Sequence, residues 1–150
     1  RKKNNNKKGC LKFNLDGRMR GGIGDSLRGN KAGRHWENLV GYTVNELKNN
    51  LELKFIEEMN WERFLNGDIQ IDHILPIELF EYQFPEDEQF KACWALENLQ
   101  PLWKAINSAK ADKLPDGRYA KTLTKQEKLE YLKSLGYDFN KKEENLCQHQ

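Results

Sequence analysis

The chain has 150 residues, of which 37% are hydrophobic, and a formal net charge of +2 at pH 7. This length suits one domain with a small core, in which four tryptophans and seven phenylalanines would supply much of the packing. The sequence contains no apolar run of membrane-spanning length and no signal-peptide core, so we expect an intracellular protein that is neither membrane-bound nor secreted.

Basic residues are concentrated in the first quarter of the chain. Residues 1–34 contain eleven basic residues (Lys or Arg) and two acidic residues (Asp or Glu). Residues 35–103 contain four basic and fourteen acidic residues, and residues 104–150 contain ten basic and seven acidic residues. A basic segment suggests a polyanionic partner, although a solvated tail is the better interpretation for residues 1–8, which contain no apolar side chain. Clustering favours phosphate contact over an ordinary basic surface for a set of five: Arg18, Arg20, Arg28, Lys31 and Arg34.

The three cysteines, Cys10, Cys93 and Cys147, lie far apart, and no Cys-x-x-Cys pair occurs. We therefore expect no structural zinc site. An odd number of cysteines without a disulfide framework favours a reducing compartment.

The first elements are basic and rich in glycine. Residues 1–12 are expected to be flexible. Six glycines within residues 13–34 weaken any helix there. Nevertheless, Met19, Ile23 and Leu27 recur every fourth residue, which indicates a short helix held by tertiary contacts.

Two capping boxes mark the starts of further helices. The stretch Thr43-Val44-Asn45-Glu46 predicts an amphipathic helix over residues 44–57. The stretch Thr124-Lys125-Gln126-Glu127 predicts a second helix that continues to Gly136. Residues 141–150 are polar, and we expect them to fray.

Two short strands are predicted between these helices. The turn dipeptide Asn66-Gly67 precedes β-branched residues that alternate over residues 69–74, and residues 99–103 form a second, edge strand that contains Pro101. Residues 86–95 predict a short helix between the strands, and residues 104–113 predict a helix after the second one.

Polar residues of possible chemical function lie on these last elements. Asp72 and His73 end the first strand, and such a pair combines a hard-oxygen metal ligand with a general base, although an isolated pair more often caps a strand. Asn107 lies inside a helix, where Asn is unfavourable, with Lys110 on the same face; a solvated helix face is an equal alternative. Asn98 suits a structural role in a tight turn.

These motifs together resemble the HNH endonucleases of the phage and mobile-element type, some of which are homing endonucleases. The resemblance rests on four pieces in order, within residues 18–114: Trp36 to Phe55, Ile71 to Pro76, Asn98 to Trp103, and Asn107 to Lys110. It implies an α+β fold in which a small ββα-metal core, with two short antiparallel strands and a helix, is embedded in flanking helices.

The resemblance also implies roles for individual residues. His73 would be the general base, and Asn98 would stiffen the loop that aims it. Asp72 and Asn107 would hold one Mg²⁺, with Mn²⁺ as a substitute. Lys110 and Lys113 would lie near the cut, beside the basic residues of the first quarter. Aromatic residues are expected to form the core rather than to stack on bases: Trp36, Phe55, Trp61, Phe90, Trp94 and Trp103.

The expected protein is thus an endodeoxyribonuclease, a phosphodiester hydrolase that acts on double-stranded DNA as a monomer or weak dimer in a bacterial or virus-infected cell. A nucleic-acid-binding module of the same fold that does not cleave is the alternative, and an RNA-directed nuclease ranks lower because no aromatic-studded sheet motif is visible. We expect three segments: a flexible basic segment at 1–12, one domain at 13–140 and a frayed tail at 141–150. Within the domain, we expect supporting helices at 18–58, the catalytic core at 66–114 and a C-terminal helix at 124–136.

Overall fold

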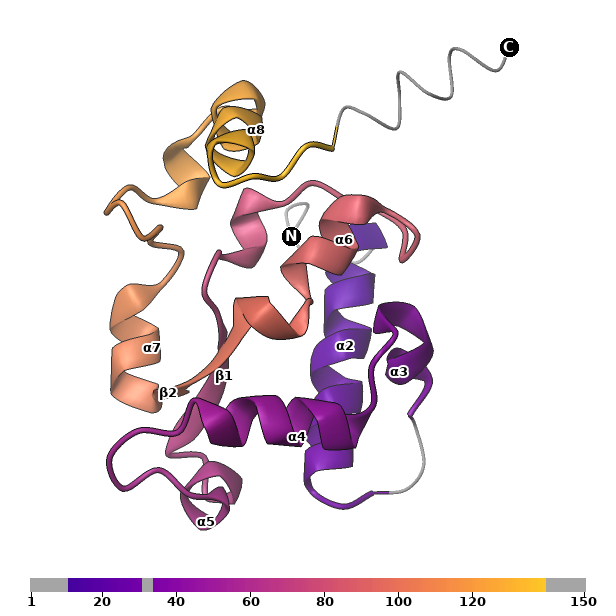
Figure 1. Ribbon diagram of the computed structural model, residues 1–150, viewed down its shortest axis with the longest axis vertical. Helices are drawn as coiled ribbons and strands as arrows, with labels where there is room; N and C mark the ends of the chain where they lie inside the picture. Colours follow the sequence, from indigo (N-terminus) through magenta and orange to yellow (C-terminus); the bar gives the residue numbers. More distant parts are fainter. Residues whose placement is uncertain (1–10, 31–33, 140–150) are drawn as a thin grey trace, which may run out of the picture.

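The computed structural model describes residues 11–30 and 34–139. Its α+β architecture combines one two-stranded antiparallel sheet with surrounding helices, which confirms the expected fold class (Figure 1). The α-helices are α2 (Leu11–Leu27), α3 (His35–Val40), α4 (Val44–Leu53), α5 (Trp61–Leu65), α6 (Glu88–Cys93), α7 (Lys104–Lys110) and α8 (Lys125–Ser134). Strands β1 (Ile69–His73) and β2 (Leu99–Trp103) are accompanied by short 3-10 helices at Ile77–Leu79, Leu96–Asn98 and Ala120–Thr122.

Helix α2 is longer than the glycine content predicts. It begins at Leu11, inside the segment expected to be flexible, and Lys12 Nζ donates to the carbonyl oxygens of Ile77 and Phe80. The expected apolar face is confirmed, because Met19, Ile23 and Leu27 are all buried. Expectations for residues 1–10, Lys31 and residues 140–150 lie outside the described residues.

Helix α2 crosses closely over α3. A Cβ atom at Gly22 would lie 2.6 Å from Cδ1 of Trp36, and the indole Nε1 of Trp36 donates to Ser26 Oγ at 3.0 Å. Gly22 therefore permits an approach that no larger residue would allow without a shift of Trp36.

Both predicted capping boxes are confirmed. Thr43 Oγ1 accepts from the backbone N–H of Glu46 at the start of α4, and Thr124 Oγ1 accepts from that of Glu127 at the start of α8. Helix α4 ends at Leu53, four residues before the expected end at 57. Helix α7 likewise ends at Lys110 instead of 113, because Ala111 adopts a positive φ of 50°.

The hairpin places the polar residues of β1 in register with β2. Asp72 pairs with Gln100 and His73 pairs with Leu99. Successive residues of a strand point to opposite faces, so Gln70 and Asp72 share one face and His73 belongs to the other. Helix α7 follows β2 directly and contacts both strands.

The core joins α2, α4 and the hairpin to the segment around α6. Its fully buried aromatic residues include Phe80, Phe90 and Trp94, together with Met19 and Leu47. Of the aromatic residues expected in the core, Trp36, Phe90 and Trp94 are buried, and Phe55 and Trp61 pack against the cluster from its edge. Trp103 is only half-buried, and the guanidinium of Arg63 lies 5.7 Å from its ring centroid.

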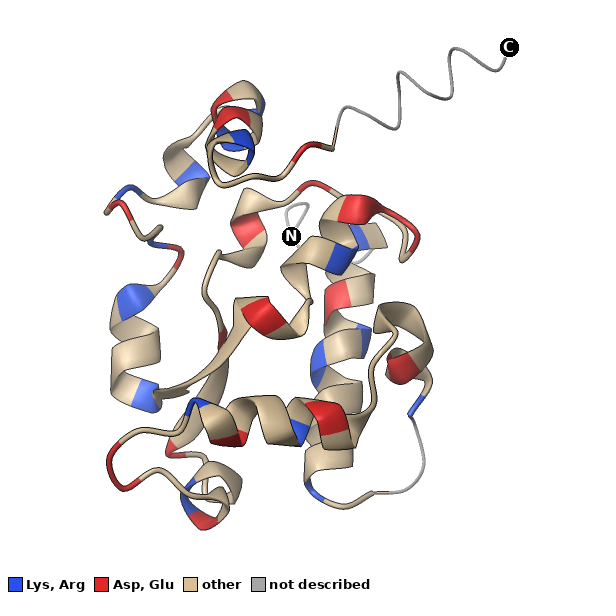
Figure 2. Ribbon diagram, viewed as in Figure 1, with Lys and Arg blue, Asp and Glu red and all other residues tan. Residues whose placement is uncertain are grey.

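Within the described ranges 11–30 and 34–139, the helices include none that combines the length and the apolar character needed to cross a membrane. Figure 2 shows Lys and Arg on α2 and at both ends of α7, which in this view lie on the two sides of β1.

Candidate active site

A cleft of about 600 Å³ opens between α2, β1, α5 and the middle and end of α7. It brings together residues that lie far apart in the sequence. Asp72, His73 and Asn107 line it from the hairpin and α7, while Arg20 lines it from α2 and Arg28 from the turn that follows α2. The cleft is therefore the place where the expected catalytic, metal-binding and phosphate-binding residues meet.

His73 is half-buried at the end of β1, and its ring packs edge-on against Trp94 with centroids 4.3 Å apart. Its Nε2 atom is buried without a hydrogen-bond partner among the described residues. Burial, followed by the positive charges of Arg20 and Lys110, lowers the pKa of His73 from 6.5 to about 3. The imidazole is therefore neutral at pH 7, and one of its two ring nitrogens carries a free lone pair.

Trp94 itself is fixed by a buried carboxylate. Its indole Nε1 donates to Asp16 Oδ1 at 3.1 Å, and the hydroxyl of Tyr82 donates to the same oxygen. The sequence indicated Trp94 as a core residue but gave no sign that it would touch His73. A chain of contacts thus runs from α2 through Trp94 to the ring of His73.

Asn98 ties together the loop that follows β1. Its Oδ1 accepts from the backbone N–H of Leu75 at 2.8 Å, and its Nδ2 donates to the carbonyl oxygens of Leu75 and Cys93. Its own carbonyl accepts from the N–H of Ile74. These four bonds fix the backbone immediately after His73, so Asn98 acts on His73 through the loop.

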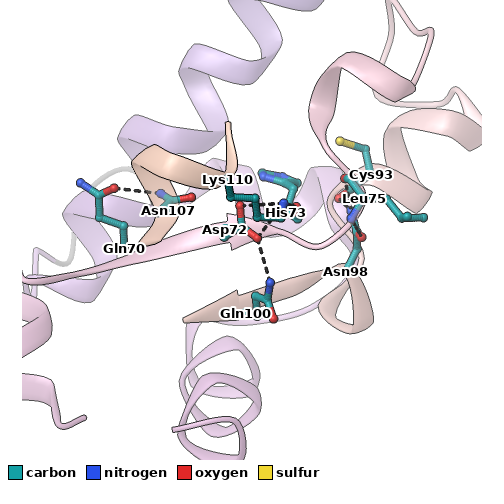
Figure 3. Close-up of polar contacts among 9 residues, drawn as sticks. All are labelled: Gln70, Asp72, His73, Leu75, Cys93, Asn98, Gln100, Asn107 and Lys110. Atoms are coloured by element: carbon teal, nitrogen blue, oxygen red, sulfur yellow. Dashed lines mark hydrogen bonds and ion pairs between the residues drawn. The ribbon is translucent and has the colours of Figure 1, made fainter. Parts of the chain in front are cut away.

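Asp72 is 7% exposed and fully engaged by polar partners (Figure 3). Gln100 Nε2 donates to its Oδ2 at 2.9 Å, and Lys110 Nζ lies 3.1 Å from Oδ2 and 3.2 Å from Oδ1. The partnership with Gln100 was not predicted, although the register of a two-stranded hairpin places these residues opposite each other.

Asn107 faces the same side of the hairpin. Its Nδ2 donates to Gln70 Oε1 at 2.8 Å, and its Oδ1 receives no hydrogen bond from any described residue (Figure 3). The amide is thus held so that its nitrogen is used and its oxygen is available. A carboxylate and an amide oxygen are the hard donors that Mg²⁺ prefers, with water completing its coordination.

Asp72 and Asn107 offer one carboxylate and one amide oxygen, so water would have to supply the remaining ligands of a metal ion held there. Among the described residues, 11–30 and 34–139, there is no group of three or more His, Cys, Asp or Glu side chains that could hold a metal ion. The ammonium of Lys110 is the feature that a metal at Asp72 would have to accommodate.

The basic residues separate into two groups. The cleft is lined by Arg20 and Arg28, and Lys110 contacts Asp72, which also lines it. The second group does not line the cleft and is exposed: Arg18, Arg34 and Lys113. The predicted phosphate-binding set is therefore brought together only in part.

Comparison with known proteins finds a stretch of similar sequence in a viral protein. The chain is 35% identical over 79 residues to an uncharacterized protein of Acanthamoeba polyphaga mimivirus. The aligned stretch covers 51% of this chain and 33% of that protein, so the chain spans about a third of the length of its curated relative. No family model matches the sequence. No solved structure matches it either.

Proposed function

We propose that this protein is a metal-dependent HNH-type endonuclease that hydrolyses phosphodiester bonds of double-stranded DNA. The observation that supports it is the content of the cleft: a neutral imidazole and two hard-oxygen groups, with the guanidinium groups of Arg20 on α2 and of Arg28 just after it. This combination meets the needs of phosphate-ester hydrolysis, which are proton removal from water and stabilisation of negative charge.

In the proposed reaction, His73 accepts a proton from a water molecule whose oxygen forms a bond to phosphorus. The bond from phosphorus to the leaving ester oxygen breaks, and that oxygen takes up a proton from solvent water. Arg20 and Arg28 hold the phosphate in the cleft, and Trp94 and Asn98 keep His73 in place. A Mg²⁺ ion, or Mn²⁺ in its place, would supply Lewis-acid stabilisation of the phosphate oxygens when held by Asp72 and Asn107.

A plasmid assay tests the proposal. Supercoiled DNA is incubated with Mg²⁺, with or without EDTA, and with wild type, His73→Ala or His35→Ala. We expect wild type to nick the plasmid, EDTA to stop it, and His73→Ala to lower the rate by about 10²- to 10⁴-fold because the general base is lost. His35 is exposed at the start of α3, outside the cleft, so His35→Ala serves as the matched control.

Equal nicking by wild type and His73→Ala, across plasmid, linear DNA and structured RNA, would contradict the proposal. Faster cleavage of the RNA than of the DNA would correct the substrate class and leave the mechanism intact.

A binding module that does not cleave is the second candidate. One observation favours it: Lys110 already neutralises Asp72, so the pocket is electrostatically complete without a metal. DNA binding that persists in EDTA and in His73→Ala, without cleavage by wild type, would identify this function.

A further inference from the structure

The ammonium of Lys110 lies across both oxygens of a buried carboxylate. Its Nζ is 3.1 Å from Oδ2 and 3.2 Å from Oδ1 of Asp72, and it donates to the carbonyl oxygen of His73 at 2.8 Å (Figure 3). A lysine ammonium has three protons to donate. These three acceptors therefore use its full capacity, and none is left for a phosphate in this arrangement.

Asp72 needs a cation at this position. The carboxylate is only 7% exposed, and Gln100 is a neutral donor that cannot balance its charge. Breaking a buried ion pair by removing one partner is strongly destabilising, and Lys110 is the charged partner that the described residues provide for this carboxylate. In the metal-free protein, Lys110 supplies the positive charge that a metal ion would otherwise supply.

A divalent cation and the ammonium cannot both occupy this carboxylate without strong repulsion, because three positive charges would gather on one negative group. Lys110 is the mobile member of the pair. Its side chain is 20% exposed, it lies in the last turn of α7, and its four-carbon stem can reorient.

We propose that Lys110 is a placeholder cation: it occupies Asp72 in the metal-free protein, leaves when a divalent ion binds there, and is thereby released to contact the substrate phosphate. The inference rests on the metal site of the proposed function. It assigns to Lys110 two successive positions, and it makes binding of the metal the event that frees this cation for DNA.

Metal affinity provides the test, without any need for cleavage. Binding of Mn²⁺ to the full chain is measured by calorimetry for wild type, Lys110→Met, Lys113→Met and the Asp72→Asn/Lys110→Met double variant. We expect Lys110→Met to bind Mn²⁺ at least tenfold more tightly than wild type, because the competing ammonium is gone. Lys113→Met removes the same charge from an exposed neighbour that lies outside the cleft, and should change the affinity less than threefold. The double variant should lose the site.

A second measurement on wild type avoids dependence on a variant that could unfold. In protein labelled with ¹³C at lysine Cε, titration with diamagnetic Mg²⁺ should shift the Lys110 signal and leave the Lys113 signal in place. Equal affinity of Lys110→Met and Lys113→Met for Mn²⁺, or a Lys110 signal that does not respond to saturating Mg²⁺, would overturn the inference.

These outcomes are separable from those of the plasmid assay. Tighter Mn²⁺ binding by Lys110→Met in a protein that never cleaves nucleic acid would support the placeholder and refute the nuclease. Metal-dependent nicking by wild type, with no difference in Mn²⁺ affinity between wild type and Lys110→Met, would support the nuclease and refute the placeholder.

Discussion

His73 combines a buried, unpaired nitrogen with two nearby positive charges, and both features oppose its protonation. An unpaired buried polar atom is uncommon in folded proteins and costs about 1–3 kcal/mol. A water molecule in the cleft that donates a hydrogen bond to this nitrogen would provide the missing partner. The same arrangement keeps the imidazole neutral at pH 7 but makes it a weak base, and the negative charge of a bound phosphate would raise its pKa towards the range that proton abstraction requires.

The lowered pKa of His73 predicts a pH dependence of stability. Its pKa falls from 6.5 in the unfolded chain to about 3 in the folded protein, so the unfolded chain binds more protons between these values. Stability must then rise with pH across this window. The contribution is fully present above pH 6.5 and is lost as the pH falls towards 3, by at most about 1.4 kcal/mol per pH unit.

Urea unfolding of wild type and His73→Gln at several pH values between 4 and 7 measures this effect. The free energy of unfolding of His73→Gln should decline less steeply with acidification than that of wild type. Parallel pH profiles for the two proteins would show that the imidazole is not shielded as described.

At the scale of elements, α2 shows where local patterns are informative and where they fail. The recurrence of apolar residues at every fourth position, Met19, Ile23 and Leu27, correctly indicated a helix, but the glycines suggested a short one. Helix-propensity scales count each glycine as destabilising for a helix. Here, however, Gly22 allows a close contact between α2 and Trp36 of α3. A contact with a remote residue leaves no periodic signal in the sequence.

The helix ends show the same division. The starts of α4 and α8 were predictable because a capping box is written within four consecutive residues. The end of α4 was not, because Lys54 bonds the carbonyl oxygens of Leu96 and Leu99, over forty residues away. Local chemistry sets a helix start, while here long-range contacts accompany its end.

A pair of glycine substitutions tests the packing of α2. Gly22→Ala should lower the free energy of unfolding by about 1–3 kcal/mol, because the new methyl group would overlap Trp36. Gly21→Ala is the matched control: a Cβ there meets nothing within 4 Å, so it should raise stability by about 0.5–1 kcal/mol through helix propensity. Urea denaturation with tryptophan fluorescence gives both values, and equal effects of the two changes would exclude the proposed contact.

For the whole molecule, the cleft depends on bringing α2 against the hairpin. Asp72, His73, Asn98 and Asn107 could be proposed as site residues from the sequence because they lie within one motif-bearing stretch, residues 72–107. The sequence could not divide the arginines of α2, since which of them faces β1 depends on how the helix is rotated in the folded protein. The structure places Arg20 on α2 and Arg28 just after Leu27, the last residue of α2, at the cleft, and leaves Arg18 outside it.

This division predicts different contributions of the arginines to DNA binding. Each phosphate contact releases about one counterion, so its loss should reduce the slope of log K against log salt concentration by about 1. We expect this reduction for Arg20→Ala and for Arg28→Ala, and a slope close to that of the parent protein for Arg18→Ala. The measurement is made by fluorescence anisotropy with a short duplex, in the His73→Ala background and in EDTA, so that the DNA stays intact. All three variants lose one positive charge, so they differ only in the position of that charge. A reduction of the slope for Arg18→Ala as large as that for Arg20→Ala would therefore mean that DNA follows the outer surface of α2 instead of the cleft.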